Sequence, residues 1–413
     1  MRRAALILAL ALVLAGGAVA AYVVHRLHQV GDVAGSASVE YSTAAAPAPA
    51  PQQGVEWPMY GYDAARTRDR ALPLRPPFRT VWTYHAGSLV EFPPSIGYGR
   101  LYLAASSGKF VAVNVKTGKR AWKWLSGRCV ASSPAVAPHG AVLMTFLNRQ
   151  PCNRSHVAQG TDGELVKFAA GFGKILWRRT IGPSESSPLL ADGRVYLGDS
   201  RGDVWAFTAH GGYKLWTFHV GAPVKGGIAY ADGRLYVPAY DGHLYCLTTG
   251  GKLLWKASAQ GTLLHGGRFY ATPAVAHDRV YLGATDGKLY SFGATSGKLR
   301  WSHSTGGYVY SSAAVWDDLV LVGSYSGRFY AFDAATGKER WSFTANGPIS
   351  GSPSVIGDVV YFATLKERTY ALDARNGKLL WTFPDGKYSP AVAVPGRLFI
   401  VGYGKVYGLV PAR

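Results

Sequence analysis

The stretch DAATGKERWSF, residues 333–343, returns as DARNGKLLWTF at residues 373–383. In both copies a Gly-Lys turn follows an apolar run, and a tryptophan stands three residues after the lysine. Glycine supplies the positive φ that a tight turn needs, so each copy predicts two strands joined by a short connection. A phrase of this kind, repeated in one chain, indicates a repeat architecture.

The repeat extends through most of the chain. Eight tryptophans follow such turns or their equivalents, at intervals that are mostly close to 40 residues: Trp82, Trp122, Trp177, Trp216, Trp255, Trp301, Trp341 and Trp381. A period near 40 with several strands in each unit is typical of propeller blades.

Each unit contains four predicted strands. After the strand that Trp301 opens come residues 311–315, 319–323 and 328–334, and the alternation of side chains in the last run is that of a half-buried strand. The first tryptophan, Trp82, lacks three strands before it, whereas the C-terminus supplies three runs (389–394, 398–402 and 406–410) with no fourth. The sequence therefore predicts an all-β, eight-bladed β-propeller with four-stranded antiparallel blades, closed by pairing the N- and C-terminal strands and preceded by one N-terminal hydrophobic helix.

The N-terminus predicts a membrane segment. The apolar run Ala4–Val24 follows Arg2 and Arg3 and is long enough to span a bilayer, and the alternative is a signal peptide cleaved after Ala20. In both cases the arginines keep the N-terminus in the cytoplasm and the rest is exported. We expect an anchor or signal segment at 1–30, an Ala/Pro/Ser-rich extended linker at 31–56 and the propeller at 57–413.

The repeated pattern A-x-D-x-x-T-G-K-x-x-W resembles that of the pyrroloquinoline quinone (PQQ)-like repeat β-propellers, from about Trp57 to the C-terminus. The resemblance implies that each of the eight tryptophans packs between neighbouring blades and is structural. The family includes quinone-dependent alcohol and sugar dehydrogenases, and also non-enzymatic members such as the propeller lipoprotein of the outer-membrane assembly machinery. Fold alone does not choose between these functions.

The motifs favour a non-catalytic member. The dehydrogenases of the family usually carry adjacent cysteines over the quinone and a calcium site, whereas Cys129, Cys152 and Cys246 are not adjacent and there is no haem-attachment motif. The eleven histidines show no metal-ligand spacing. We therefore assign no catalytic residue, metal or cofactor, and predict a membrane-anchored, extracytoplasmic binding or assembly module of the cell envelope. The alternative is a PQQ-dependent alcohol or sugar dehydrogenase.

Candidate binding residues come from aligning the blades at the start of their innermost strands. Equivalent positions must surround the central axis at one mouth of the channel, and they carry acids, bases and phenols: Glu91, Glu185, Lys225, Tyr270, Tyr310, Ser350 and Lys387. We expect Glu185 to pair with Lys225, Lys387 with Glu91, and Tyr270 to lie beside Tyr310. Such a ring is either a ligand or peptide site, or a set of ion pairs and stacked rings that brace the channel mouth.

Two insertions, Leu147–Thr161 and Ser258–Arg268, are placed on the same face, each either a disordered flap or a recognition loop. Cys152 lies in the first insertion and Cys129 lies on the same face of that blade. We therefore predict a disulfide between them in the exported protein. Cys246 occupies a small inward-facing position and is predicted to be a buried free thiol.

The formal net charge of +20 lies entirely after residue 56, so the propeller is strongly basic. Outside the cytoplasm we expect an envelope protein or peptide, an anionic wall polymer or a lipid surface as partner, and no nucleic acid. We expect a monomer on the cell membrane, single-pass, with the propeller outside, or, if the signal is cleaved, a secreted or periplasmic protein.

Overall fold

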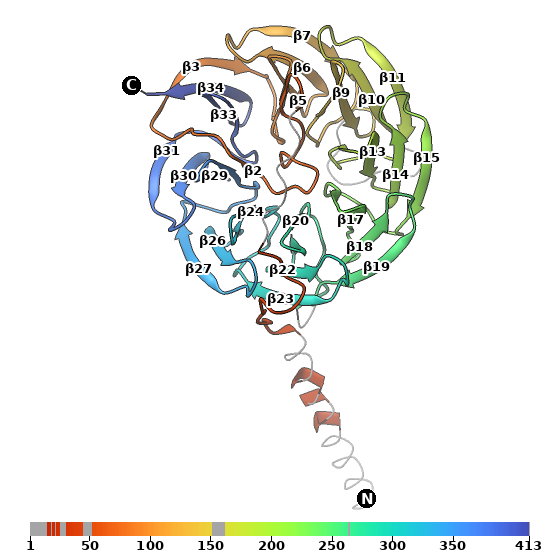
Figure 1. Cartoon of the computed structure of the whole chain (residues 1–413), viewed down its shortest axis with the longest axis vertical. Coiled ribbons are helices and arrows are strands. Elements are labelled where there is room, and N and C mark those ends of the chain that lie inside the picture. The colour runs from red at the N-terminus through yellow and green to blue at the C-terminus, as the bar shows by residue number, and fades with distance from the viewer. Residues whose placement is uncertain are drawn as a thin grey trace, which may run out of the picture.

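The fold is described from a computed structural model, which describes residues 15–17, 19–20, 22–24, 30–43, 52–150, 162–262 and 265–412. Eight small sheets stand around a central axis, as the sequence predicted (Figure 1). Seven of the blades follow one another along the chain, and each runs from an inner strand to an outer one.

The strands have the following bounds. Blades 1 to 4 are formed by β4 (Ser95–Gly97), β5 (Arg100–Ala105), β6 (Lys109–Asn114) and β7 (Arg120–Leu125); β8 (Ala135–Ala137), β9 (Ala141–Phe146), β10 (Gly163–Ala169) and β11 (Ile175–Ile181); β12 (Leu189–Ala191), β13 (Arg194–Gly198), β14 (Asp203–Thr208) and β15 (Lys214–His219); and β16 (Ala229–Ala231), β17 (Arg234–Pro238), β18 (His243–Thr248) and β19 (Leu253–Ser258). Blades 5 to 7 are formed by β20 (Ala274–Ala276), β21 (Arg279–Gly283), β22 (Lys288–Gly293) and β23 (Leu299–Ser304); β24 (Ala314–Trp316), β25 (Leu319–Gly323), β26 (Arg328–Asp333) and β27 (Glu339–Thr344); and β28 (Ser354–Ile356), β29 (Val359–Thr364), β30 (Arg368–Asp373) and β31 (Leu379–Phe383).

Blade 8 is shared by the two ends of the chain. Its inner strands are β32 (Val392–Val394), β33 (Arg397–Val401) and β34 (Lys405–Pro411), and its outer strand is β3 (Phe78–His85). β3 pairs with β34 in antiparallel register, with Thr83 opposite Tyr407. Figure 1 shows the C-terminus beside β3. The predicted closure is confirmed: the outer strand of blade 8 comes from the start of the ring and its inner strands come from the C-terminus.

The tryptophans join each blade to the next. The indole nitrogen of Trp301 donates to the carbonyl of Ala334 at 2.9 Å, and that of Trp122 donates to Ala170 at 2.9 Å. The Gly-Lys turn of the following blade lies against the indole ring: a Cβ on Gly337 would stand 2.7 Å from Cδ2 of Trp301, and the φ of Gly337 is +73°. The glycine is therefore required both for the turn and for the approach of the ring.

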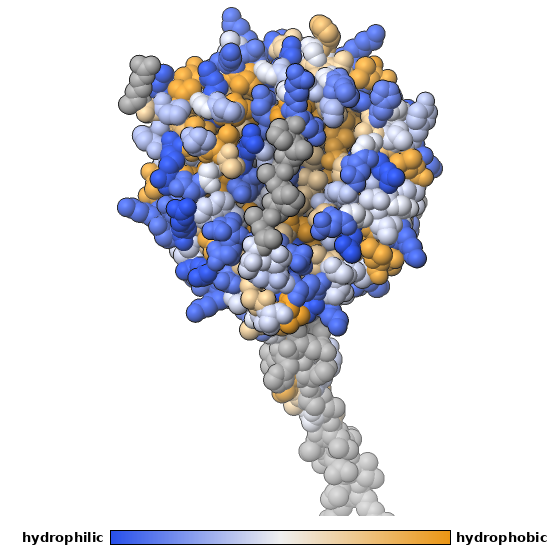
Figure 2. All heavy atoms as spheres, in the orientation of Figure 1, coloured by the Kyte–Doolittle hydropathy of each residue, from blue (hydrophilic) through white to orange (hydrophobic). Residues whose placement is uncertain are grey.

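The hydrophobic core is divided among the spaces between blades. One buried cluster combines Tyr281 and Leu289 of blade 5 with Val320 and Phe332 of blade 6, and similar clusters lie between the other neighbours. Hydrophilic residues are spread over the rim of the ring, with hydrophobic ones between them (Figure 2).

Two faces of the ring are distinguished below. The mouth face carries the loops that lead from each outer strand to the next blade, together with the loops between the second and third strands. The turn face carries the short turns between the first and second strands and the Gly-Lys turns between the third and fourth.

Residues 31–43 lie in the segment 31–56 that was expected to be an extended linker, and in the structure residues 30–43 pack against blade 5. Val33 forms a two-way backbone bridge with Ser302 of β23, and Asp32 accepts hydrogen bonds from Ser304. Glu40 accepts the amides of Thr295 and Ser296 at 2.9 Å. We call residues 30–43 the strap. Its acidic side chains pair with basic residues of blade 5, Asp32 with Lys288 and Glu40 with Arg300. The low apolar content of the strap gave no sign of this charge complementarity.

Residues 55–70 form a second unexpected feature, which we call the central segment; it lies inside the ring of blades (Figure 1). β1 (Val55–Trp57) pairs with β4 of blade 1, and β2 (Asp69–Arg70) pairs in parallel with β28 of blade 7. Between them, carbonyls of the segment accept amides from the inner strands of blades 2, 4, 5, 6 and 7, at Val136, Tyr230, Val275, Val315 and Val355. The inner strands thus satisfy edge groups that would otherwise face the channel.

Of the predicted membrane segment Ala4–Val24, the structure describes residues 15–17, 19–20 and 22–24, which are helical. Among the residues that it describes, no helix is both long and apolar enough to cross a bilayer.

Candidate functional site

The seven predicted site residues all lie on the mouth face, each in the loop that enters the inner strand of a blade. Five of them form a connected series over blades 3 to 7: Glu185, Lys225, Tyr270, Tyr310 and Ser350. The link between Tyr310 and Ser350 passes through Tyr325, whose ring lies 5.1 Å from that of Tyr310 and whose hydroxyl lies 3.4 Å from Oγ of Ser350.

The charged part of the ring centres on Glu185. Its Oε1 lies 3.1 Å from Nζ of Lys225, and its Oε2 accepts a hydrogen bond of 3.4 Å from the hydroxyl of Tyr270. Burial, followed by the nearby carboxylate of Glu185, raises the pKa of Glu91, while Lys225 opposes this shift. Burial also raises the pKa of Tyr270. Glu91, Glu185 and Lys225 therefore share one electrostatic environment at the mouth.

The predicted pair of Lys387 with Glu91 is wrong. Nζ of Lys387 lies 3.3 Å from Oε1 of Glu367, in the loop between β29 and β30 of the neighbouring blade, and it lies over the rings of Tyr388 and Tyr403. The alignment of the blades predicts where the backbone of Lys387 lies. Its long side chain, however, lets the ammonium reach the more exposed Glu367 on another loop.

A cleft of about 1190 Å³ opens on the mouth face over blades 4 to 6. Its wall contains Tyr310 of the ring and three tyrosines that sequence reasoning missed, Tyr240, Tyr308 and Tyr325. The rings touch in series, with centroids 5.9 Å apart for Tyr308 and Tyr310 and 6.4 Å apart for Tyr308 and Tyr325. Tyr240 and Tyr325 stand two residues before the glycine of the loop between the second and third strands, where other blades have Ser200 or Thr285, and this substitution was the available signal.

Arg268 brings a cation into the same cleft. Its guanidinium lies 5.3 Å from the centroid of Tyr240, and its backbone amide donates to Oγ1 of Thr285 at 2.9 Å. Within the described part of the chain, no carboxylate lies within ion-pair distance of this guanidinium. The predicted insertion Ser258–Arg268 therefore contributes a cation to the cleft, together with backbone from Gly266 and Gly267. Of the other insertion, Leu147–Thr161, only residues 147–150 are described.

The floor beneath the mouth is built from hydroxyl groups and from the central segment. Each of several inner strands accepts an amide of the preceding blade on a side-chain hydroxyl: Ser187 from Ser133 (2.9 Å), Thr272 from Gly227 (2.7 Å), Ser312 from Thr272 (2.8 Å) and Ser352 from Ser312 (2.9 Å). The hydroxyl of Tyr60 lies 2.8 Å from Oγ of Ser352. The repeated serines at the inner strands therefore hold the blades together around the axis.

Two arginines of the central segment are fully buried on this axis. Arg66 donates to the carbonyls of Tyr60 and Ile228, and Arg68 donates to the carbonyl of Arg66 at 2.7 Å. Burial, followed by the charge of Arg68, lowers the pKa of Arg66 to about 9. These side chains occupy the channel and tie its lining to the central segment.

The two cysteines among the described residues, Cys129 and Cys246, agree with the prediction. Cys129 is disulfide-bonded, and Cys246 is free and buried, with a pKa raised to about 12 by burial. Cys152 lies outside the described residues, so the pairing of Cys129 with Cys152 stays a prediction.

The family resemblance raises the question of a calcium and quinone site on the axis of the ring. Across 30–43, 52–150, 162–262 and 265–412, no three His, Cys, Asp or Glu side chains converge on a point that could hold a metal ion. The axis below the mouth is filled by Tyr60, Arg66 and Arg68. The residues present do not fit a calcium-bound quinone on this axis.

The fold and the site together define a closed repeat propeller with a blocked channel and an aromatic cleft at one mouth. The family model described as "Outer membrane protein assembly factor BamB" matches residues 147–224, 200–313 and 304–413, which is more than half of the sequence. The chain belongs to this family of PQQ-like repeat β-propellers.

Individual relatives have different functions. The chain is 27% identical to a tetrathionate hydrolase from Acidithiobacillus ferrooxidans over 295 residues, covering 62% of this chain and 59% of that protein. Two solved structures share the fold: BamB from Moraxella catarrhalis (TM-score 0.65, 17% identity, 81% of this chain and 100% of that one) and a quinohemoprotein alcohol dehydrogenase from Comamonas testosteroni (TM-score 0.70, 16% identity, 87% and 81%). The chain spans less than two thirds of the length of the curated relatives it matches.

Proposed function

We propose that this protein is a non-catalytic binding or assembly propeller of the cell envelope, which holds an extended segment of a partner protein in the cleft at its mouth face. The observation that carries the proposal is the series of touching tyrosines beside the guanidinium of Arg268, which makes no ion pair with any described residue. Membership of a family described as an outer-membrane assembly factor supports a partner in the envelope.

The chemistry of the cleft suits a peptide. Tyrosine and arginine provide large contact area at low cost in conformational entropy, and they are enriched at the centres of protein interfaces. Gly266, Gly306 and Gly307 leave backbone accessible at the wall, where an extended chain finds hydrogen-bond partners. Arg268 favours an acidic side chain or a chain terminus next to the tyrosines.

The mouth acids are less suited to catalysis than their position suggests. The carboxylate of Glu185 is held by Lys225 on one oxygen and by Tyr270 on the other, so both oxygens already have donors. The second candidate is an enzyme, which the tetrathionate hydrolase relative favours and the dehydrogenase fold permits.

The proposal is tested by crosslinking from inside the cleft. A photoreactive phenylalanine analogue in place of the exposed Tyr308 is expected to capture an envelope protein in intact cells, identified by mass spectrometry. Lys225→Glu combined with Tyr310→Ala is expected to reduce capture at least about tenfold, which corresponds to the loss of one strong interface contact.

The matched control combines Lys338→Glu with Leu380→Ala, both exposed and outside the mouth face. Its capture is expected to equal that of the unmodified chain. Equal capture by the mouth variant, with its fold intact by circular dichroism, would leave the ring as a brace and reject the cleft as the partner site.

A further inference from the structure

Two neighbouring blades depart from the repeat at their Gly-Lys turns, on the turn face. Where blades 1, 5, 6 and 7 have Thr117, Ser296, Thr336 and Asn376 before the turn glycine, blade 2 has Phe172. Where six turns have lysine directly after that glycine, blade 3 has Tyr213. An aromatic residue thus replaces a polar one in each turn.

Both aromatic side chains point away from the protein. Phe172 is 88% exposed and Tyr213 is 71% exposed, and they are the two most exposed large hydrophobic residues of the described chain. Leu176 and Leu215, on the strands that follow, are about half exposed. A folded domain does not gain stability from aromatic rings that are exposed to water. Their exposure therefore indicates a contact with apolar groups outside the domain.

The charges around these rings are mainly positive. Lys174 and Lys214 flank them and are exposed, and neither makes an ion pair within the described ranges. Asp192, in the turn between β12 and β13 on the same face, is engaged, because it accepts a hydrogen bond from Tyr230. A partner at this surface must therefore offer negative charge next to apolar groups.

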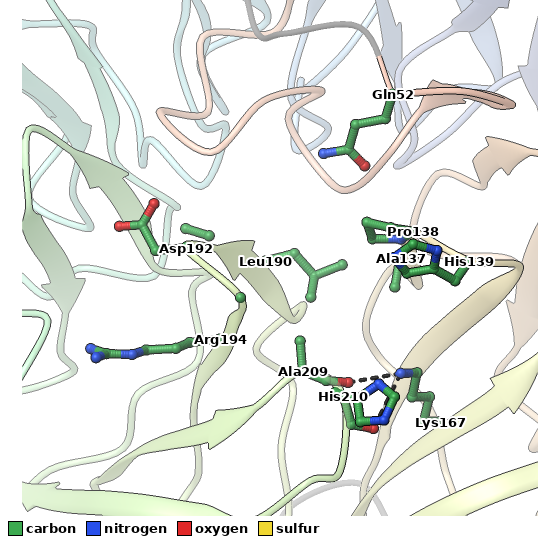
Figure 3. A pocket seen from close by; sticks show the side chains of 12 residues that line it. Gln52, Ala137, Pro138, His139, Lys167, Leu190, Asp192, Arg194, Ala209 and His210 are labelled. Carbon is green, nitrogen blue, oxygen red and sulfur yellow. Dashed lines mark hydrogen bonds between the residues drawn. The ribbon is translucent and has the colours of Figure 1, made fainter.

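An apolar pocket of about 310 Å³ lies next to the turns, between blades 2 and 3 (Figure 3). Pro138 and Leu190 line it from the two blades, and Ala209 and His210 belong to the turn that carries Tyr213. Lys167 closes one side, where its ammonium donates to the carbonyls of Ala209 at 2.8 Å and His210 at 3.3 Å. The hollow thus adjoins the turn that carries Tyr213, while Phe172 and Tyr213 themselves lie outside its lining.

We propose that this patch, formed by Phe172, Tyr213, Lys174, Lys214 and the adjacent pocket, docks the propeller onto an anionic lipid surface. Phe172 and Tyr213 enter the boundary between head groups and acyl chains, where aromatic side chains are favoured, and the lysines contact the lipid phosphates. Each lysine near such a surface contributes about 1 kcal/mol, so the attraction weakens as salt is added. The proposal concerns the face opposite the cleft and is independent of the proposed function.

The test uses the full chain in proteoliposomes made of phosphatidylcholine alone or with 30% phosphatidylglycerol, a composition chosen to supply about one anionic head group in three. Amide exchange is followed by mass spectrometry in peptides covering 169–176 and 208–215. These peptides are expected to exchange at least about fivefold more slowly in the anionic membrane than in the neutral one, and the difference is expected to shrink in 0.5 M salt, where the Debye length is a few Å.

Phe172→Ser combined with Tyr213→Ser is expected to abolish the difference, whereas the control Tyr308→Ser, an exposed tyrosine of the mouth face, is expected to preserve it. Both variants are compared with the unmodified chain in exchange of the central segment, which reports folding. Equal exchange in the two membranes, or protection that survives the double substitution, overturns the proposal. Protection that appears only in native membranes and is lost after protease treatment of partner proteins assigns the patch to a protein partner and likewise overturns it.

Discussion

The ammonium of Lys225 lies 3.1 Å from Oε1 of Glu185, on successive blades of the propeller. Equivalent positions on neighbouring blades are brought together by the ring, although they are distant in the sequence. Because both side chains are partly exposed, the pair adds little to folding and leaves its surroundings available for a partner.

Lys225→Glu is therefore expected to lower the free energy of unfolding by about 1 kcal/mol or less. Thermal unfolding of the unmodified chain and of the variant measures the change. A loss of several kcal/mol would identify the ring as a structural brace rather than a binding surface.

Substitution of Arg66 is expected to be costly. Arg66→Met removes the donor of the Ile228 and Tyr60 carbonyls on the buried axis, and each buried acceptor left alone costs about 1 to 3 kcal/mol. We expect at least about 2 kcal/mol of lost stability in urea unfolding.

The control Arg75→Met removes an exposed arginine that lies 2.9 Å from Asp358, and a surface pair of this kind contributes about 0 to 1 kcal/mol. Similar losses for the two variants would show that the central segment contributes little to the closed ring.

Docking of the strap is expected to depend on pH through Glu40. Burial acts to raise the pKa of Glu40, but hydrogen bonds from Ser296, Arg300 and the amide of Thr295 outweigh it, and the pKa falls below 4.5. A carboxyl with a lowered pKa in the folded state stabilises that state above the unfolded pKa, and this contribution is lost as the pH falls through the folded value.

Amide protection factors in residues 31–43, corrected for intrinsic exchange, should therefore be constant near neutral pH and fall below about pH 4.5. In Glu40→Gln they should be low at neutral pH and change little with acid. Unchanged protection of the strap in that variant would exclude Glu40 as its anchor.

The cysteine pattern predicts one disulfide, between Cys129 and Cys152, in the exported protein. Mass spectrometry of a non-reduced digest should show the two peptides linked and Cys246 alkylated only after unfolding, because that thiol is buried. A linked peptide that contains Cys246 would contradict the pairing.

No quinone-dependent turnover is expected. Purified protein supplied with PQQ and calcium should oxidise alcohols and sugars no faster than background with an artificial electron acceptor. Turnover that disappears on chelation of calcium would instead establish the dehydrogenase alternative; hydrolysis of tetrathionate, assayed in parallel, addresses the other enzymatic relative.

The sequence by itself determined the ring. A tryptophan and a turn glycine in each repeat specify local strands and one recurring contact between neighbours, since the indole of Trp301 needs the bare backbone of Gly337. Local patterns of this kind can be recognised in a sequence because the alternation of side chains in a strand and the positive φ of a turn each depend on a few neighbouring residues. The missing strands around Trp82 then required closure of the chain ends.

Only the tertiary structure decided what fills and surrounds the ring. The strap and the central segment bind through backbone hydrogen bonds and buried charges, as between Arg66 and Ile228, and these depend on partners more than 100 residues away. Lys387 pairs with Glu367 instead of Glu91 because its long side chain can reach acids on several loops. The tyrosine cleft likewise required Tyr240 and Tyr310 to be brought together from different loops, which no local pattern encodes.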